Sequence, residues 1–414
     1  MQLPEDFKRE TRLVMGDERF NRFMGAFDEE PPVSIRLNPR RHIPHSSFHI
    51  PHSTFHIPQE RIPWCEEGYY LAGRPQFTFD PLFHAGCYYV QEAASMFVTH
   101  IIRSVDIPTP KRALDLCAAP GGKSTALLSV LPDECTLVSN EPISNRAQIL
   151  LENITKWGYP NSMVTNNYPR EFRKAKLTFD LILCDVPCSG EGMFRKDPDT
   201  IGEWSQQNVE KCWRLQREIV ADAWECLAPG GLLIYSTCTF NLKENEENVR
   251  WILENFDAEA LDIPIDPSWN ITGSLLEGFT APVYRFIPGI TRSEGLFICA
   301  IRKRGTRNED TLTKEKLEKT RCLKVLDPSN LLPPSSILLP RINIDYPEAL
   351  KYLRGEALVL PADTPRGIVN ITYKGIVLGP AKNIGNRANN LYPKAWRIKT
   401  THLPAEEVKI IDIQ

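Results

Sequence analysis

The chain of 414 residues lacks several features that mark particular classes of protein. No apolar run approaches the length of a membrane span, so we expect a soluble protein. The eleven cysteines include no Cys-x-x-Cys pair, and because the usual zinc-ligand spacings are absent we expect no metal site. No short apolar segment follows the charged start Met1–Arg12, which predicts a protein of the reducing cytoplasm.

An excess of charge of one sign is also absent from the chain as a whole. The formal net charge is −3, which argues against a nonspecific polyanion binder. The balance is uneven, however: residues 302–414 carry 20 Lys and Arg against 12 Asp and Glu, out of 49 and 52 in the whole chain. The basic end is therefore the better candidate for contacting phosphate groups.

The hydrophobic pattern predicts an α/β protein. At this length two or three domains are expected. Between Arg112 and about Arg302 strand-like runs alternate with helical ones, which is typical of a doubly wound, Rossmann-like sheet. The strand-like runs are Arg112–Leu116, Thr136–Asn140, Ser162–Thr165, Phe179–Cys184, Gly231–Ser236, Val283–Phe286 and Leu296–Ile301. Helical apolar spacing occurs over residues 147–154 and 209–226, the second helix ending before Ala228–Gly231.

The flanking regions have different patterns. Pro32–Asn38 looks extended, and we expect the aromatic residues between Trp64 and Tyr89 to belong to a core. A seven-residue unit repeats over residues 42–58 and holds five of the eight histidines. Its prolines favour an extended surface loop over a metal site. Arg302–Lys319 is charged and reads as a linker, and the residues beyond it contain short strand-like pieces separated by Pro and Gly turns.

A glycine turn follows the first strand of the predicted sheet. In Cys117–Ser124 the glycines allow backbone amides to approach a ligand at the start of a helix. Gly122-Lys123-Ser124 fits the end of the nucleotide-phosphate loop pattern, which leaves an ATP-binding protein as a rival. Cys117 stands where that pattern requires its first glycine, and Pro120 removes an amide. A tight turn without any ligand is the plainer alternative.

Glu141 ends the next strand, 26 residues after Asp115. A doubly wound sheet places an acid there to accept hydrogen bonds from ribose hydroxyls, although a surface glutamate is the alternative. An acidic residue placed to bind a ribose, without a loop that fits a phosphate, favours a cofactor of the nucleoside type. S-adenosylmethionine is such a cofactor.

Two cysteines, Cys188 and Cys238, each follow a strand-like run in a polar turn, and Asp185 directly ends its strand. Carboxyl ends of parallel strands meet at one crevice, where reacting atoms would be held. A thiolate is a strong nucleophile when a cation such as Lys123 lowers its pKa. A strand-end Asp can also merely cap a helix. The remaining apolar-run cysteines, namely Cys184, Cys212, Cys226 and Cys299, read as buried packing.

Several of these motifs together resemble the RNA cytosine-5 methyltransferases of the NOL/NOP/Sun family, and in particular the bacterial ribosomal RNA enzymes of the RsmF (YebU) type. The likeness is carried by Asp115–Ser124, Asp185–Gly192, Arg195–Pro198, Tyr235–Thr239, Ile35–Asn38 and Gln91–Ser95. The tail Gly385–Arg397 is similar to that group's terminal PUA-like, RNA-binding module.

The resemblance implies a chemistry for the two thiols. Carbon 5 of cytosine is a poor nucleophile, so a thiolate first adds to carbon 6. By resemblance Cys238 is this nucleophile, Cys188 assists loss of the carbon-5 proton and release of the enzyme, and Asp185 hydrogen-bonds the ring edge. The catalytic set is then Cys238, Cys188, Asp185 and Lys123.

The resemblance also implies a set of residues that bind S-adenosylmethionine. The methionine portion would be held by Cys117, Ala118, Ala119, Pro120, Gly121, Gly122 and Lys123, with Asp185 beside them. Glu141 would bind the ribose. Tyr168 stands where the family commonly has an Asp for the adenine, and Asn167 is the candidate to replace it.

The implied organisation has three domains and an RNA substrate, expected to be 16S ribosomal RNA. Residues 1–105 would form an RNA-contacting α+β extension, 106–303 the Rossmann-like methyltransferase domain, 304–322 a linker and 323–414 a PUA-like domain. A flipped base would be flanked by nucleotides held by basic side chains; the candidates are Arg195, Lys196, Arg387, Lys394 and Arg397. A ribosome-assembly factor that binds RNA without turnover is the rival outside enzymes.

Overall fold

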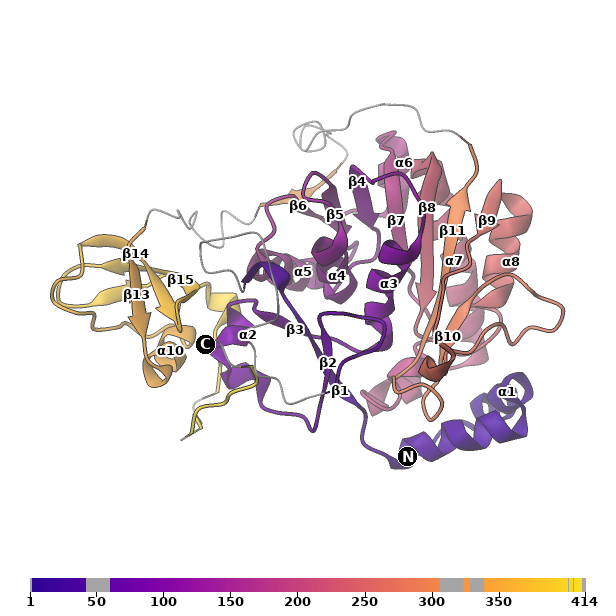
Figure 1. The fold of residues 1–414 in the computed structure, drawn as a ribbon, viewed down its shortest axis with the longest axis horizontal. Helices are drawn as coiled ribbons and strands as arrows, with labels where there is room; N and C mark the ends of the chain where they lie inside the picture. Colours follow the sequence, from indigo (N-terminus) through magenta and orange to yellow (C-terminus); the bar gives the residue numbers. More distant parts are fainter. Residues whose placement is uncertain are drawn as a thin grey trace.

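The computed structural model describes residues 2–41, 60–305, 323–327, 339–400, 402–404 and 406–411. The repeat at residues 42–58 and most of the expected linker lie outside the described residues. Figure 1 shows a larger body built on a central sheet, an N-terminal region beside it, and a C-terminal β-rich part at the far side.

The central sheet has nine strands and is mixed, which confirms the predicted α/β class. Five strands are parallel, in the order β8-β7-β4-β5-β6. Their bounds are Arg112–Asp115 (β4), Thr136–Asn140 (β5), Ser162–Thr165 (β6), Phe179–Asp185 (β7) and Leu227–Thr237 (β8). Antiparallel strands extend both edges: Ala258–Ala260 (β9), Tyr284–Phe286 (β10), Leu296–Lys303 (β11) and Val325–Leu326 (β12).

Helices cover both faces of this sheet. One apolar cluster contains α3 (Phe97–Ser104), α4 (Gly122–Val130) and α5 (Ser144–Trp157). The opposite cluster contains α6 (Pro169–Lys174), α7 (Gln206–Cys226) and α8 (Glu246–Asn255). The strands are buried on both faces because alternate side chains point to opposite clusters, as Leu181 and Leu183 do against Ile182.

The order of the strands creates a crevice at the end of β4. From β4 the chain proceeds outward through β5 and β6, and then returns to the other side of β4 to form β7 and β8. Loops from neighbouring strands therefore diverge beyond the carboxyl ends of β4 and β7, where ligands bind in sheets of this kind.

One boundary within the sheet differs from the sequence prediction. The helix α7 ends at Cys226, and β8 begins at once, so residues 228–231 lie inside the strand instead of forming a separate stop. The pairing of β8 with β7 shifts register there. A Cβ on Gly231 would meet the carbonyl oxygens of Ala228 and Asp180 at 2.8 and 2.9 Å, so the close approach requires glycine.

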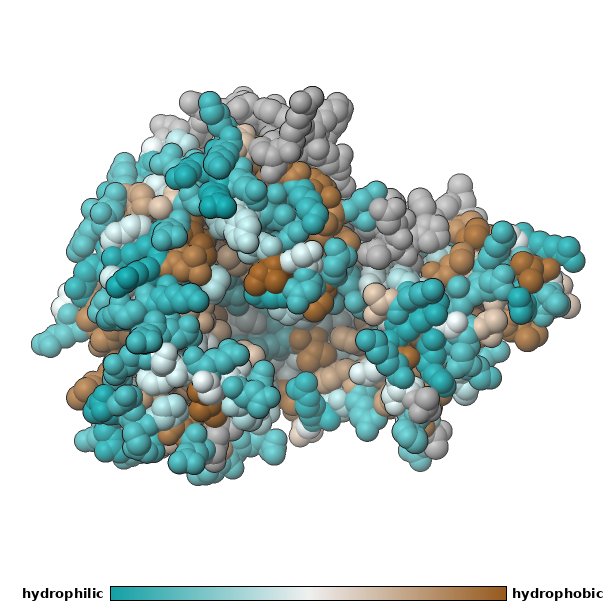
Figure 2. Space-filling model, turned by 180° about the vertical axis from the view of Figure 1, so that it is seen from behind, coloured by the Kyte–Doolittle hydropathy of each residue, from teal (hydrophilic) through white to brown (hydrophobic). Residues whose placement is uncertain are grey.

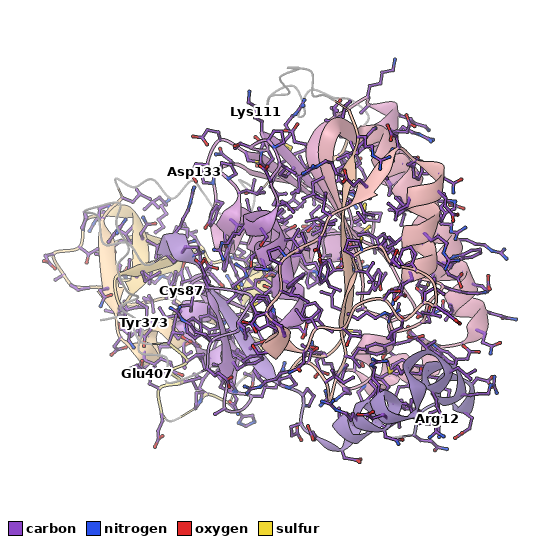
Figure 3. The ribbon with its side chains drawn as sticks, turned by 45° about the vertical axis from the view of Figure 1, so that its right-hand side comes forward. Arg12, Cys87, Lys111, Asp133, Tyr373 and Glu407 are labelled. Atoms are coloured by element: carbon purple, nitrogen blue, oxygen red, sulfur yellow. The ribbon has the colours of Figure 1, made fainter. Side chains whose placement is uncertain are left out.

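The N-terminal region contains the long helix α1 (Glu5–Gly25) and a three-stranded antiparallel sheet, in the order β2-β1-β3. Its strands are Val33–Leu37 (β1), Gly68–Leu71 (β2) and Tyr88–Val90 (β3). Many of the aromatic residues between Trp64 and Tyr89 are buried, as predicted. Arg12 on α1 lies far from the C-terminal part (Figure 3).

The described residues of the C-terminal part form a small sheet with the order β13-β14-β15-β16, together with the helix α10 (Tyr346–Leu353). Its strands are Arg341–Ile344 (β13), Gly367–Tyr373 (β14), Ile376–Asn383 (β15) and Ala388–Asn390 (β16). It shares an apolar cluster with the N-terminal sheet and with α2 (Pro81–His84). Figure 3 places Cys87 of the N-terminal region beside this part, where Tyr373 and Glu407 also lie. The residues of β12, expected in the C-terminal domain, instead pair with β6 of the central sheet.

Candidate active site

Three strand ends bring the sequence-predicted catalytic residues together. Asp185 is the last residue of β7, and the turn after it carries Cys188. Cys238 follows the last residue of the neighbouring strand β8. Lys123 lies in the first turn of α4, which begins after the glycine turn beyond β4.

The sulfur atoms of Cys188 and Cys238 are 3.2 Å apart, and both residues are partly exposed. Their loops are joined at 2.9 Å between the hydroxyls of Ser189 and Thr239, and by the Gly192 amide, which donates to the Cys238 carbonyl. The hydrogen bond between the two thiols lowers the pKa of Cys238, and Lys123 acts in the same direction, whereas burial and the charge of Asp185 act to raise it. The same hydrogen bond, together with burial, raises the pKa of Cys188. These directions favour Cys238 as the thiolate of the pair.

Lys123 and Asp185 form an ion pair beside the thiols. The Lys123 ammonium donates to Asp185 Oδ2 at 2.8 Å, and the Ser236 hydroxyl donates to Oδ1 at 2.7 Å. Burial acts to lower the pKa of Lys123, but the charge of Asp185 and the hydrogen bond to it outweigh that effect and raise it. The ammonium therefore stays charged near neutral pH.

The glycine turn is held from both sides. Gly121 adopts a positive φ of 115°, which favours glycine, directly before α4. The Ala118 amide donates to the Asn140 carbonyl at 2.7 Å. On the other side the buried Arg36 of β1 donates to Thr125 Oγ1 at 2.7 Å and to Gln91 Oε1 at 2.8 Å. The N-terminal sheet therefore supports the helix that carries Lys123.

Two buried carboxylates next to this turn each have an oxygen without a hydrogen-bond partner among the described residues. Asp115 Oδ2 accepts from the Ser124 hydroxyl at 2.7 Å, whereas Oδ1 has no partner. Glu141 Oε1 accepts from the Ile143 amide, whereas Oε2 accepts no hydrogen bond, with Arg146 3.5 Å away. Burial raises the pKa of Asp115 to about 7. A ligand carrying an amine and hydroxyls would satisfy both free oxygens.

Asp115 was not among the predicted site residues, although its place at the end of β4 was a usable signal. Glu191 and Glu244 were missed as well, and both lie buried beneath the thiol loops. Glu191 lies within the Asp185–Gly192 segment that carries the family resemblance, which was a usable signal, whereas nothing in the local sequence distinguishes Glu244 from a surface glutamate. Their burial depends on contacts with elements that are distant in the chain.

Asn167, predicted to contact the adenine, has structural contacts in the described chain. Its side-chain amide donates to the Lys324 carbonyl at 3.2 Å, and its oxygen accepts from the Lys324 amide at 2.9 Å. The residue is buried and fixes the backbone beside β12. One amide hydrogen and one lone pair of the oxygen remain, so a contact with the adenine stays a prediction.

The basic residues predicted to hold RNA differ in their surroundings. Arg195 is paired with the buried Glu294 at 2.8 Å, and Arg397 donates to the Tyr392 carbonyl, so both have structural contacts. Lys196, Arg387 and Lys394 are exposed. Hydrophilic residues cover most of the face in Figure 2, and hydrophobic ones form separate small groups.

A groove of about 1060 Å³ lies between the N-terminal region and the central body. Its basic lining residues are Arg74, Arg195, Lys196 and Arg292. Lys196 belongs to the segment that follows the Cys188 turn, so one wall of the groove continues toward the thiols.

Two further findings concern metals and membranes. Across the part of the chain that the structure describes, no three His, Cys, Asp or Glu side chains are grouped so as to hold a metal ion. No described helix combines the length and apolar character needed to cross a bilayer.

Comparison with known proteins adds three matches to protein-family models. Residues 106–302 match the model for 16S rRNA methyltransferase RsmB/F, residues 3–93 the N-terminal domain of 16S rRNA methyltransferase RsmF, and residues 340–398 the methyltransferase RsmF PUA domain. Together they span most of the chain.

Similar proteins and structures agree with these models. Ribosomal RNA small subunit methyltransferase F of Serratia proteamaculans is 34% identical over 309 residues, and that of a strain of Escherichia coli is 33% identical over 309. The matches cover 73% and 72% of this chain and 63% of each relative, so the chain spans less than two thirds of their length.

Among solved structures, a methyltransferase homologue from Pyrococcus horikoshii has a TM-score of 0.60 at 26% identity, covering 72% of this chain and 95% of that one. NSun6 from the same organism, solved with SFG, has a TM-score of 0.58 at 20% identity, covering 73% and 99%, and carries the likeness of fold alone. The chain therefore belongs to the RsmB/F family of 16S rRNA methyltransferases, with N-terminal and PUA domains of the RsmF type.

Proposed function

We propose that this chain transfers a methyl group from S-adenosylmethionine to carbon 5 of a cytosine in RNA, with 16S ribosomal RNA as the substrate. The observation that carries the proposal is the pair of sulfur atoms 3.2 Å apart, beside a charged lysine and next to the glycine turn. The relatives named as small-subunit RNA methyltransferases support the choice of substrate.

The residues around the glycine turn fit a nucleoside-type methyl donor. Asp115 Oδ1 is a free acceptor for an amino group, and Glu141 Oε2, ion-paired with Arg146 at 3.5 Å but without a hydrogen bond, would accept one from a ribose hydroxyl. The backbone of Cys117–Gly122 would hold the methionine portion between them. When bound, S-adenosylmethionine supplies an electrophilic methyl group on a sulfonium sulfur. Asn167, held by the backbone of Lys324, would offer its remaining amide hydrogen or oxygen lone pair to the adenine.

The two thiols would divide the remaining chemistry. The Cys238 thiolate forms a bond with carbon 6 of the cytosine, and the resulting enamine makes carbon 5 nucleophilic enough to accept the methyl group. The charge that the addition places on the nitrogen-3 edge takes up the proton of the Cys188 thiol, which leaves Cys188 as a thiolate. After the methyl group has been transferred and S-adenosylhomocysteine has left, the Cys188 thiolate takes the carbon-5 proton. The electron pair of that C–H bond restores the 5,6 double bond, and the sulfur–carbon 6 bond breaks to return the Cys238 thiolate. The lowered pKa of Cys238 and the raised pKa of Cys188 support this division.

Asp185 and Lys123 would act on the ring and on the thiolate. Asp185 is held by Ser236 and Lys123, so its carboxylate can meet a proton on the nitrogen-3 edge of the ring. The Lys123 ammonium stabilises the negative charge on Cys238. Addition at carbon 6 requires a base that has left its stack, which favours single-stranded or looped RNA.

Binding and transfer assays distinguish this proposal from its rivals. Labelled S-adenosylmethionine should bind and ATP should not, which would remove an ATP-binding role for Gly122-Lys123-Ser124. Methyl transfer to cytosine in small-subunit ribosomal RNA would remove a purely structural RNA-binding role. Binding of ATP alone, or tight RNA binding without transfer, would overturn the proposal.

Variants of the two cysteines test the assignment of roles. Cys238→Ala should abolish methyl transfer and leave no covalent adduct, because the nucleophile is gone. Cys188→Ala should accumulate a protein–RNA adduct on a denaturing gel, because the adduct forms but is not released. Buried Cys299 offers the control, since Cys299→Ala removes a thiol within β11, outside the two turns that carry the paired cysteines. If Cys238→Ala were the variant that accumulated adduct, the roles would be reversed.

A further inference from the structure

Two buried glutamates link the loops that carry the thiols. Glu191 accepts from the Phe240 and Asn241 amides in the loop after Cys238, at 2.7 and 3.1 Å, and from Trp204. Glu244 accepts from the Ser189 amide at 3.0 Å, directly after Cys188. The two carboxylates share the Asn241 side-chain amide, at 3.1 and 2.8 Å. Each loop is therefore fixed by a carboxylate that belongs to the other loop.

Glu244 and its partner Gln216 of α7 form hydrogen bonds with the backbone on both sides of Cys188. Gln216 Nε2 donates to Glu244 Oε2 at 2.7 Å and to the Pro187 carbonyl at 2.9 Å. The residues before and after Cys188 are thus both held by this unit. Gln216 in turn accepts from the Asn248 amide at 2.7 Å, which anchors it to α8.

Glu244 differs from its neighbour Glu246, which is also fully buried. Glu246 pairs with the buried Arg285, which donates to it at 2.7 Å. Within the described parts of the chain, the hydrogen bonds to the Glu244 carboxylate come from the neutral groups of Ser189, Gln216 and Asn241 and from no cation. Burial and the nearby charge of Glu191 raise the pKa of Glu244 to about 7. A buried carboxylate that is not paired with a cation destabilises the folded state. The presence of Glu244 is therefore better explained by a role in placing the thiols than by a role in folding.

Cys238 depends less on this unit than Cys188 does. It follows the last residue of β8, where Thr237 pairs with Phe297 of β11. Its carbonyl accepts from Gly192, and Thr237 Oγ1 donates to Asn245. Cys188 lies in a turn outside any strand, between the two backbone groups that Gln216 and Glu244 hold. Loss of Glu244 should therefore displace Cys188 more than Cys238.

We propose that Glu244 is a positioning residue for the release step, holding Cys188 beside the carbon-5 proton of a base attached to Cys238. The inference rests on the proposed function, because it assumes that Cys238 forms the adduct and Cys188 resolves it. It predicts that formation and breakdown of the adduct respond differently to substitution of Glu244.

The test compares Glu244→Gln with the full-length wild-type protein, using transcribed small-subunit ribosomal RNA and S-adenosylmethionine. Glu244→Gln should form adduct within about threefold of the wild-type rate but break it down at least tenfold more slowly. Its thermal unfolding midpoint at pH 8 should be unchanged or raised, since an ionised buried carboxylate is removed. Glu244→Asp, which restores the charge, should recover part of the breakdown rate.

Two controls share the helix α8. Glu247→Gln changes a partly exposed carboxyl next to the same network, and Ile252→Val loosens the core without touching the thiol loops. In both variants the ratio of the rate of adduct formation to the rate of adduct breakdown should equal that of the wild type. If Glu244→Gln proves poorly folded, Gln216→Asn tests the same hydrogen bonds around Cys188, since the shorter amide cannot reach both Pro187 and Glu244.

The outcomes separate this inference from the proposed function. If Glu244→Gln slows adduct formation and breakdown equally, or changes neither, the positioning role is wrong even though methyl transfer stands. If it behaves as Ile252→Val does once their stabilities are taken into account, Glu244 is merely structural. If folded Cys188→Ala accumulates no adduct at all, it is the proposed division of the thiols that fails.

Discussion

Two neighbouring regions of the crevice differ in how completely their buried carboxylates are hydrogen-bonded. On the donor side, formed by Asp115, Cys117–Gly122 and Glu141, each acid leaves one buried oxygen without a hydrogen bond. On the thiol side, formed by Cys188, Cys238, Glu191 and Glu244, every carboxylate oxygen accepts at least one hydrogen bond. The acids of the donor side can accept further hydrogen bonds from a ligand, whereas the hydrogen bonds of the thiol-side carboxylates all come from the protein. Changes on the first should alter affinity, and changes on the second should alter rates.

Lys123 belongs to both regions, and its loss should have the largest effect. Lys123→Met removes the cation that lowers the pKa of Cys238 and leaves Asp185 unpaired. We expect single-turnover methyl transfer at saturating donor to fall by roughly 10²–10³-fold, as for loss of one electrostatic group in an active site. The measurement is a quench assay with labelled donor.

The matched control for that variant is Lys111→Met. Lys111 is exposed and directly precedes β4, at the opposite end of that strand from the crevice. It should keep the wild-type rate. If Lys123→Met lowered only the affinity for the methyl donor, Lys123 would belong to the donor side alone. It would then not act on the thiols, contrary to the comparison drawn above.

Sequence reasoning found the parts of this site that follow strand ends. The strands β4 to β7 are short apolar runs bounded by polar turns, so their positions were predicted within a residue. Because Lys123, Asp185, Cys188 and Cys238 follow such strands, their meeting at one edge could be predicted as well.

The residues that were missed depend on contacts between distant segments. Glu244 is buried among groups from distant segments, including Gln216 of α7, 28 residues earlier in the chain. Asn167 is hydrogen-bonded to Lys324, 157 residues later, which directly precedes a two-residue strand too short to give a pattern. The start of β8 was misplaced because Pro229 and two glycines read as a turn, although the strand passes through them with a register shift.

Asp115 should give the next largest effect, confined to the donor side. Asp115→Asn replaces the acceptor at the free oxygen by an amide and removes the charge that would face an amino group. We expect the affinity for S-adenosylmethionine to fall by about 1.5–3 kcal/mol, as for a lost hydrogen bond to a charged group, while turnover at saturating donor changes little. Titration calorimetry measures the affinity.

Asp133→Asn provides the control, because Asp133 is an exposed acid paired with Arg40 on the surface. Its donor affinity should equal that of the wild type. If Asp115→Asn instead changed the breakdown of the covalent adduct at saturating donor, the division between the two regions would not hold.

The smallest effect expected is a dependence of donor affinity on pH that the thiol side does not share. The pKa of Asp115 is raised from its usual 3.8 to about 7, so in the free protein the carboxyl is mostly protonated at pH 5.5. A donor amine that binds the ionised form must first displace that proton, so affinity should rise about tenfold between pH 5.5 and 7. Asp115→Asn should flatten this profile.

The same shift has the opposite sign for the stability of the free protein. The folded state binds the extra proton between the usual pKa and the raised one, so the contribution of Asp115 to stability is lost as pH rises from about 4 to 7. S-adenosylmethionine should therefore raise the thermal unfolding midpoint by more at pH 7 than at pH 5.5, although the free protein gains nothing from Asp115 over that range. An increase in midpoint that is equal at both pH values would mean that the donor does not meet the Asp115 carboxylate, and the free oxygen would then serve another ligand.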